Sequence, residues 1–243
     1  IMPSLVGSEM CIRDRCSMRD ITIMRRFVGG EIMLSIEKLY QILYQNMGPQ
    51  YWWPAETPIE MMLGAILVQN TNWNNADIAL SRLKEETSFN AQTILKMPLE
   101  SLQQVIRSSG FYKNKAKAIQ ALLLWLNQHH FDYSSIAKLY GDSLRKELLT
   151  IRGIGEETAD VLIVYIFKGK EFIPDSYTRR IFRKLGYQHT ESYHKLKQEL
   201  TLPESFSNQD ANEFHALLDN FGKNYFNGKG KQRYTFLDTY FKK

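Results

Sequence analysis

The sequence predicts an all-α protein. Amphipathic stretches with the period of a helix recur along most of the chain, and several of them begin at capping residues. No alternating strand pattern runs for more than three or four residues. The chain has 243 residues, of which 44% are hydrophobic and 23% charged, so it can form one large or two modest cores. Its net charge of +5 favours a polyanionic partner without proving one.

The first 32 residues differ from the rest. The run IMPSLVGSEMCIRDRC has no helical period and contains both cysteines, Cys11 and Cys16. We expect residues 1–32 to be a non-native or disordered extension, with Met33 as the true start. They form neither a signal-peptide core nor a membrane span, so we expect a cytoplasmic protein with no membrane partner. The remaining chain has no cysteine and its histidines lack ligand spacing, so no metal is expected.

Residues 36–47 have one apolar helical face that ends at Gly48-Pro49. Tyr51-Trp52-Trp53-Pro54 follows. Two adjacent tryptophans before a proline cannot both face one core from a regular helix. Either at least one lines a cavity or a surface, or both plug a gap between domains.

Thr57-Pro58-Ile59-Glu60 has the pattern of a helix start, and a buried helix over 58–68 leads to Gln69. Trp73 opens an amphipathic stretch, where a tryptophan is either packing or the wall of a pocket. Further helices are predicted from Pro98, over 118–126 and, as a loop or short helix, over 131–139. Between them stand Lys113, Lys115 and Lys117, which suit a groove edge or a solvated helix start.

A tight turn, Gly153-Ile154-Gly155, separates two apolar runs, which predicts helix, glycine turn, helix. Glycines on both sides of a buried isoleucine allow positive φ and the close approach of another backbone. The free N–H groups at the start of the second helix can hold a phosphate without reading sequence. The alternative is an ordinary helical hairpin.

Asp175 lies 18 residues beyond Glu157 and opens another helix, over 176–185. It suits the N-cap, and a helix N-terminus also keeps a carboxylate ionised. An ionised carboxylate can stabilise positive charge on a sugar or orient a water. The same helix carries a dense basic cluster with Arg179 and Arg180, which suits either a phosphate backbone or a solvated face. Helices over 191–200 and 206–226 follow, and Lys223 lies in the second.

At these residues the sequence resembles the helix-hairpin-helix DNA glycosylases of the endonuclease III type, with nearest likeness to 3-methyladenine DNA glycosylase III-like members. The resemblance covers most of residues 50–226. It implies a central domain over 56–169, a second domain of 33–55 with 170–243, and an active cleft between them. Gly153, Ile154 and Gly155 match the family's hairpin, Asp175 its catalytic aspartate, and Gln69 the glutamine that enters the gap left by an extruded base.

Two departures narrow the activity that the resemblance implies. Members that cleave the strand carry a lysine where this chain has Glu157, and a carboxylate cannot form a Schiff base, so we expect a monofunctional enzyme. Relatives often carry a four-cysteine iron–sulfur loop near the C-terminus, and this chain has no cysteine there. We therefore expect no iron–sulfur cluster and no other cofactor.

The first hypothesis is excision of a damaged base from duplex DNA by a monomer, with the base flipped into a pocket that includes Trp52, Trp53, Pro54, Trp73, Glu157 and Lys223. Aromatic walls favour a cationic ring, which points to alkylated purines such as 3-methyladenine. Adenine opposite an oxidised guanine is the alternative substrate. Other hypotheses are a DNA-binding protein without catalysis, which the retention of Asp175 argues against, and a lyase whose amine is Lys223.

Overall fold

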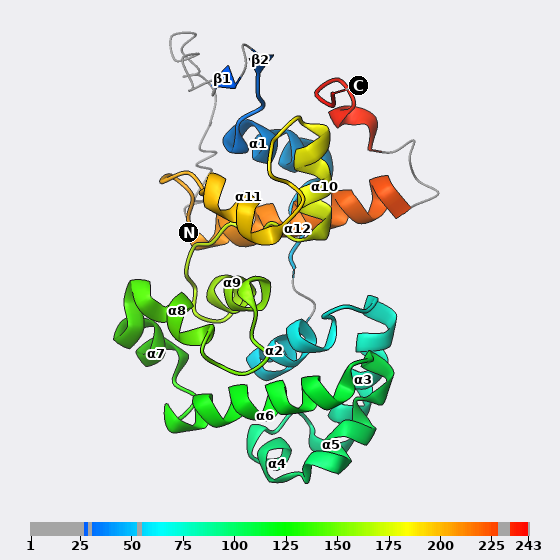
Figure 1. Ribbon diagram of the computed structural model, residues 1–243, viewed down its shortest axis with the longest axis vertical. Helices are drawn as coiled ribbons and strands as arrows, with labels where there is room; N and C mark the ends of the chain where they lie inside the picture. The colour runs from blue at the N-terminus through cyan, green and yellow to red at the C-terminus, as the bar shows by residue number, and fades with distance from the viewer. Residues whose placement is uncertain (1–26, 29–30, 53–54, 228–233, 243) are drawn as a thin grey trace, which may run out of the picture.

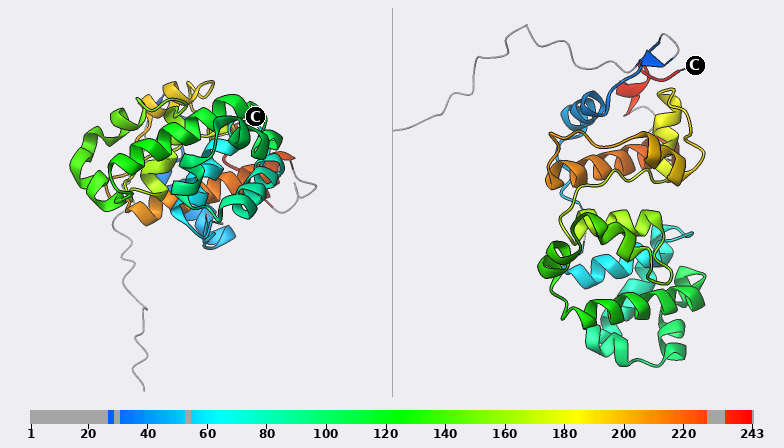
Figure 2. Two further views of the ribbon diagram at one scale, coloured as in Figure 1. Left: turned by 90° about the horizontal axis from the view of Figure 1, so that it is seen from below. Right: turned by 60° about the vertical axis from the view of Figure 1, so that its left-hand side comes forward.

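The computed structural model of the chain describes residues 27–28, 31–52, 55–227 and 234–242. Its helices form two domains stacked along the long axis of the molecule (Figure 1, Figure 2). The predicted fold class is therefore confirmed. Within the segment expected to be foreign, the described residues form a short antiparallel pair, β1 (Phe27–Val28) and β2 (Glu31–Ile32). No helix in the described part of the chain is long and apolar enough to cross a membrane.

The central domain contains the helices from α2 to α9 (Figure 1). Its core is formed by buried side chains from Met61 to Ile173, together with Ala211. The elements are α2 (Pro58–Leu67), α3 (Trp73–Thr87), α4 (Ala91–Lys96), α5 (Leu99–Val105), η1 (Arg107–Ser109), α6 (Tyr112–Gln128), α7 (Tyr133–Tyr140), η2 (Gly141–Ser143), α8 (Leu144–Leu148) and α9 (Glu156–Tyr165).

The second domain joins the two ends of the described chain. Its core takes buried residues from 36–43 and from 172–237. The chain passes from this domain to the central one after α1 and returns after α9 (Figure 1). The elements are α1 (Ile36–Met47), α10 (Ser176–Lys184), α11 (Tyr193–Glu199), α12 (Asn208–Asn227) and η3 (Thr235–Leu237).

Local capping explains where several helices begin. The Thr57 side chain accepts a hydrogen bond from the N–H of Glu60 at the start of α2. Before α12, the Ser207 hydroxyl accepts from the N–H of Asp210, whose carboxylate accepts from the N–H of Ser207. This reciprocal arrangement satisfies two donors that the helix itself leaves free.

Lys115 is the part of the lysine-rich turn that the sequence analysis misread. Its side chain is buried, and its ammonium donates to the carbonyls of Leu67 (2.9 Å) and Ser109 (2.6 Å). Burial lowers the pKa of Lys115 to about 8. Lys115 therefore ties the end of α2 to η1 instead of facing a groove or solvent, because both carbonyls end helical turns and lack partners within them.

Candidate active site

Asp175 ends the extended segment 172–174 and caps α10. Its Oδ1 accepts a hydrogen bond from the backbone N–H of Thr178 at 2.6 Å, and the residue is only 8% exposed. An N-cap satisfies one of the free donors of the helix and places the carboxylate at the positive end of its dipole. The expected cap is present, and it holds the carboxylate at the junction of the two domains.

Helix α12 brings a histidine to the other oxygen of this carboxylate. The Nε2 of His215 lies 3.6 Å from Oδ2 of Asp175. On the opposite side of the ring, Nδ1 is 2.7 Å from the hydroxyl of Tyr165, in α9. Both His215 and Tyr165 are buried. One helix of the central domain and two of the second domain therefore meet at Asp175.

A second acid follows on the same face of α12. Asp219 stands four residues after His215, is buried, and pairs with the ammonium of Lys223 at 2.5 Å. Burial, and then the charge of Asp175, raise the pKa of Asp219. Lys223 is thus already engaged with an acid, which makes it a poor free amine for a lyase reaction.

The ionisation of Asp175 is decided by opposing effects. Burial alone would raise its pKa, but the imidazole of His215 and the N–H of Thr178 act more strongly in the other direction. The pKa of Asp175 is consequently lowered. The carboxylate is therefore negative at neutral pH, as the stabilisation of a positive sugar requires.

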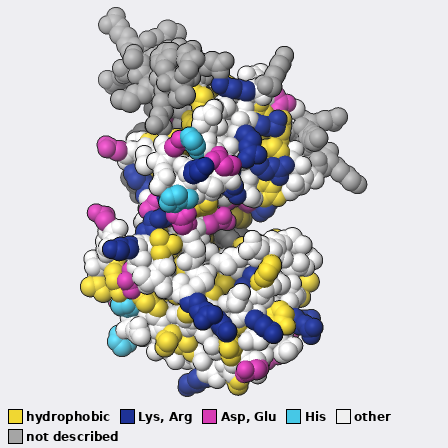
Figure 3. All heavy atoms as spheres, in the orientation of Figure 1, with side chains coloured by type: hydrophobic (Ala, Val, Ile, Leu, Met, Phe, Trp, Pro, Cys, Tyr) yellow, Lys and Arg dark blue, Asp and Glu magenta, His cyan; other side chains and the backbone are white. Residues whose placement is uncertain are grey.

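Glu157 lies in the first turn of α9. The resemblance noted in the sequence analysis implies a lysine at this position in strand-cleaving members. The side chain of Glu157 reaches solvent, but protein surrounds it on many sides. The surface is hollowed at the junction of the two domains (Figure 3). Removal from bulk water, and then the charge of Asp175, raise the pKa of Glu157 to about 7.

Of the predicted aromatic walls, Trp52 joins this site. Its ring is 5.5 Å from His215 and 6.1 Å edge-to-face from Tyr165, between ring centroids, and the ammonium of Lys223 lies 5.4 Å from its ring centroid. Trp73 opens α3 and packs against the core of the central domain. Trp53 and Pro54 lie outside the described residues.

The hairpin connects α8 to α9, and its two glycines serve different purposes. Gly153 has φ +82°, and a Cβ there would stand 2.5 Å from the Cβ of Ala118 in α6. Gly155 has φ −89° and open space where its Cβ would be. Both glycines allow positive φ, but within the hairpin the left-handed conformation is taken up at Gly153 alone.

The other predicted hairpin contacts are clarified as well. Ile154 is buried in the central core, so only its backbone can face a phosphate. Gln69, at the end of α2, donates to the hydroxyl of Thr158 at 2.8 Å and to the carbonyl of Gly153 at 3.4 Å. It therefore lies beside the hairpin.

The basic residues of α10 do not form one patch. Arg179 is half-buried and donates to the carbonyl of Glu191 at 3.0 Å, and its charge acts on Glu157. Arg180 is exposed and lies 3.9 Å from the ring centroid of Phe226. Successive residues of a helix point about 100° apart, so the two arginines diverge. Of the pair, only Arg179 faces the acidic groups of the site.

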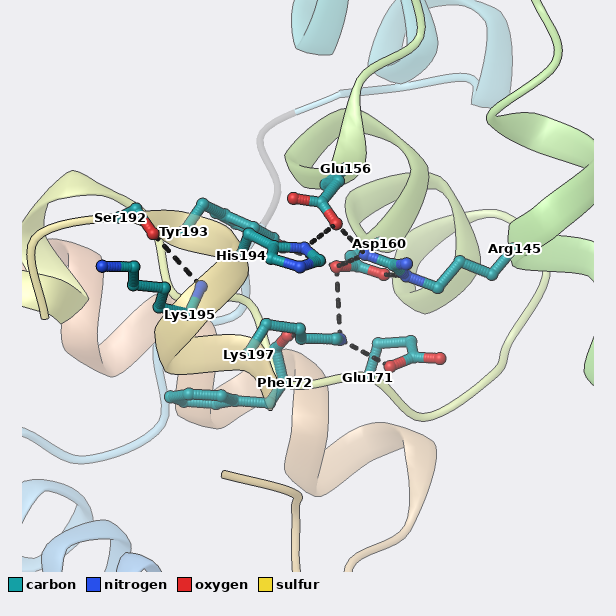
Figure 4. Close-up of polar contacts among 10 residues, drawn as sticks. All are labelled: Arg145, Glu156, Asp160, Glu171, Phe172, Ser192, Tyr193, His194, Lys195 and Lys197. Atoms are coloured by element: carbon teal, nitrogen blue, oxygen red, sulfur yellow. Dashed lines mark hydrogen bonds and ion pairs between the residues drawn. The ribbon is translucent and has the colours of Figure 1, made fainter. Parts of the chain in front are cut away.

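A separate cluster of charges joins the two domains beside the site (Figure 4). Asp160, in α9, is fully buried and lies 2.7 Å from Nε of Arg145, 3.2 Å from the ammonium of Lys197 and 2.6 Å from the hydroxyl of Tyr193. Lys197 also donates to the carbonyl of Phe172, three residues before Asp175. The cluster therefore anchors the segment that leads to Asp175.

The structure does not fit an iron–sulfur cluster at the end of the second domain. The sequence after α12 has no cysteine. Leu237 is fully buried, and Phe236 and Phe241 contact the ring of Phe221. Hydrophobic packing, and no thiolate, occupies the described part of this segment. Among the described residues, no group of three or more His, Cys, Asp or Glu is placed to hold a metal ion.

The sequence analysis missed His215, Tyr165 and Asp219. A signal for two of them was present, since His215, Asp219 and Lys223 recur every four residues along this helix. A polar row at that spacing marks one face of a helix. Tyr165 gives no such signal, because it continues the apolar run of α9.

Comparison with known proteins agrees with this geometry. Residues 63–204 match the model of the HhH-GPD superfamily of base excision DNA repair proteins. A protein of Methanocaldococcus jannaschii whose name assigns it as a DNA repair glycosylase is 38% identical over 188 residues, which are 75% of this chain and 84% of that protein.

Two solved structures have the same fold. The 3-methyladenine DNA glycosylase MagIII of H. pylori, bound to 1,N6-ethenoadenine, is 29% identical with a TM-score of 0.62, covering 79% of this chain and 98% of that one. An endonuclease III–DNA complex is 22% identical with a TM-score of 0.62, covering 78% and 86%. The buried aspartate beside a glycine hairpin, the family match and these relatives agree: the chain belongs to the HhH-GPD superfamily of base excision DNA repair glycosylases.

Proposed function

We propose that this glycosylase is monofunctional and hydrolyses the N-glycosidic bond of an alkylated purine in duplex DNA. The observation that carries the proposal is the ionised carboxylate of Asp175, which has acidic neighbours and, among the described residues, no free amine beside it. Lyase chemistry would need such an amine. Glu157 occupies the lysine position, and Lys223 is paired with Asp219. Water is then the nucleophile.

In this reaction the bond between the sugar and the base breaks, and its electrons leave with the base. Positive charge develops on the sugar, and Asp175 stabilises it. A water adds to the sugar carbon and loses a proton. Glu157, whose pKa is raised to about 7, is suited to accept that proton.

The charge of the site supports a cationic base. Glu157 interacts electrostatically with Asp175 and Arg179, and Asp219 interacts with Asp175 and Lys223. Three carboxyl groups and two cations therefore share the site, and the ammonium of Lys223 lies 5.4 Å from the Trp52 ring centroid. Alkylation at N3 or N7 makes a purine cationic and a better leaving group, which aromatic faces and a negative pocket both favour. The likeness to a glycosylase named for 3-methyladenine supports the same substrate class.

Single-turnover assays on a panel of duplexes test the proposal. The panel contains 3-methyladenine, 7-methylguanine, hypoxanthine, uracil, and adenine opposite 8-oxoguanine, each assayed with and without alkali. We expect release of the methylated purines with strand cleavage only after alkali. Cleavage without alkali would contradict the monofunctional assignment, and preference for adenine or for a neutral base would contradict the substrate class.

Trp52→Ala tests the pocket. Stacking on a base is worth about 1–3 kcal/mol, so excision of 3-methyladenine should fall by about 10-fold or more. Trp125→Ala is a matched control, because that tryptophan packs on Phe167 and His129 in the central domain. It should lower thermal stability and leave excision by the folded enzyme nearly unchanged.

A further inference from the structure

We propose that His215 is a positioning residue for Asp175, held in its working orientation by the hydroxyl of Tyr165. The inference rests on the proposed function, since it concerns the same carboxylate. It adds a row of three neighbouring side chains, Tyr165, His215 and Asp175, that links α9 of the central domain to α12 and α10 of the second. Neither His215 nor Tyr165 needs to touch the substrate for this role.

The partners of the ring decide which nitrogen carries the proton. Nδ1 of His215 is 2.7 Å from the hydroxyl oxygen of Tyr165, and Nε2 is 3.6 Å from Oδ2 of Asp175. A carboxylate can only accept, so the nitrogen that faces it carries hydrogen. In the neutral ring Nδ1 is then the acceptor, and the tyrosine hydroxyl donates to it.

The carboxylate of Asp175 has a neighbour on each of two sides. The N–H of Thr178 binds Oδ1 of Asp175, and the Nε2–H of His215 faces Oδ2. The two groups stand on different helices, and of the two only the N–H of Thr178 is within hydrogen-bond distance of the carboxylate. The 3.6 Å separation leaves room for it to shift toward the sugar, and contacts of this kind shorten when substrate binds.

The surroundings of His215 suit a fixed ring. Trp52 covers it with ring centroids 5.5 Å apart, which keeps water from competing for its nitrogens. Charged or titratable groups also surround the pair formed by His215 and Asp175. They are Glu157 and Tyr165 from α9, Arg179 from α10, and Asp219 and Lys223 from α12. The charge of Asp175 raises the pKa of both Asp219 and Glu157, whereas the imidazole of His215 lowers the pKa of Asp175 itself.

The test compares four variants of the full chain by single-turnover excision against pH, with affinity for an uncleavable abasic duplex measured in parallel. His215→Phe should lower excision by about 10-fold to 100-fold while affinity stays within about 3-fold. The acid limb of its rate profile should move to higher pH, because Asp175 loses the neighbour that lowers its pKa. His215→Gln retains an N–H donor and should recover part of the rate.

Tyr165→Phe removes only the oxygen that orients the ring, and it carries the test if His215→Phe fails to fold. Its expected loss is smaller and in the same direction. Tyr193→Phe is the matched control, since it deletes a buried tyrosine hydroxyl that binds Asp160 at the same junction. That control should leave the pH profile unchanged.

A wild-type rate and profile in both His215→Phe and Tyr165→Phe would overturn the positioning role while leaving the glycosylase proposal intact. So would a loss that merely follows the unfolded fraction of each variant. Release of no base from any duplex by the wild-type protein would overturn the proposed function, and this inference with it. The two failures are therefore distinguishable.

Discussion

Two buried aspartates stand on either side of the domain junction, and they have opposite surroundings. Asp160 is met by a guanidinium, an ammonium and a phenol at 2.6 to 3.2 Å. Asp175 has one backbone N–H at 2.6 Å and an imidazole at 3.6 Å. The carboxylate of Asp160 is paired with two cations (Figure 4), whereas that of Asp175 is contacted by a backbone N–H and an imidazole ring.

The different partners of Asp160 and Asp175 distinguish a structural carboxylate from one that is suited to catalysis. A carboxylate that is fully paired with cations has little left to offer a developing positive charge, although it joins the elements that supply the cations. A carboxylate held by neutral donors keeps its charge available and oriented. We therefore assign Asp160 to the framework and, under the proposed function, Asp175 to the reaction, although both are buried and both lie at the interface.

The largest expected effect is the loss of base excision when the charge of Asp175 is removed. Asp175→Asn preserves shape and the cap but deletes the charge, so excision should fall by about 10²-fold or more, with duplex affinity nearly unchanged. Single-turnover base release and equilibrium binding to an abasic duplex measure the two quantities. Activity within a few-fold of wild type would show that Asp175 is not the carboxylate that stabilises the sugar.

The matching change at Asp160 should affect stability instead. Asp160→Asn leaves Arg145 and Lys197 without their common partner, which we expect to lower the free energy of unfolding by about 3 kcal/mol, at the low end for a buried pair because Arg145 remains partly exposed. Chemical denaturation measures this loss. Excision by the folded fraction should stay within a few-fold of wild type, and a selective loss of excision would erase the distinction between the two aspartates.

The two glycines of the hairpin are expected to differ in the same way, with Gly153 affecting stability and Gly155 affecting DNA binding. Gly153→Ala should lower the free energy of unfolding by about 2 kcal/mol, because it combines φ +82° with a contact to Ala118. Gly155→Val should hardly change stability, but it should weaken binding to all duplexes alike and reduce the salt dependence, since a phosphate contact carries no sequence. Denaturation and binding at several salt concentrations test the pair. Sequence-selective weakening by Gly155→Val would contradict a phosphate contact.

The smallest effect concerns Glu157 and pH. Its folded pKa, about 7, lies above the ordinary value of 4.5 for glutamate, so the folded state binds a proton more tightly than the unfolded state. The wild-type protein should therefore lose stability as pH rises from about 4.5 to about 7. Glu157→Gln removes this penalty and should be the more stable protein at pH 8, with the difference vanishing near pH 4. Thermal unfolding across this range measures it, and parallel curves for the two proteins would show that Glu157 is not desolvated.

The sequence by itself determined the helical fold class, the hairpin and Asp175. Each of these depends on neighbours in the chain: helical periodicity, capping at Thr57 and Ser207, glycines in a turn, and a carboxylate at a helix start. The sequence also singled out Glu157, because the prediction made for it depends only on its spacing from the hairpin. Local signals of this kind survive without knowledge of the tertiary structure.

Only the tertiary structure decided which polar residues share the site. Tyr165 and His215 lie 50 residues apart, and Tyr165 reads as one more apolar position of α9. Lys115 reads as a surface lysine until two carbonyls are seen to surround it. Gly153, and not Gly155, bears the positive φ because α6 crosses beneath it. Periodicity reports which face of a helix is buried, but the partner of a buried polar group depends on how the helices pack across the two domains, and that information resides in contacts between distant residues.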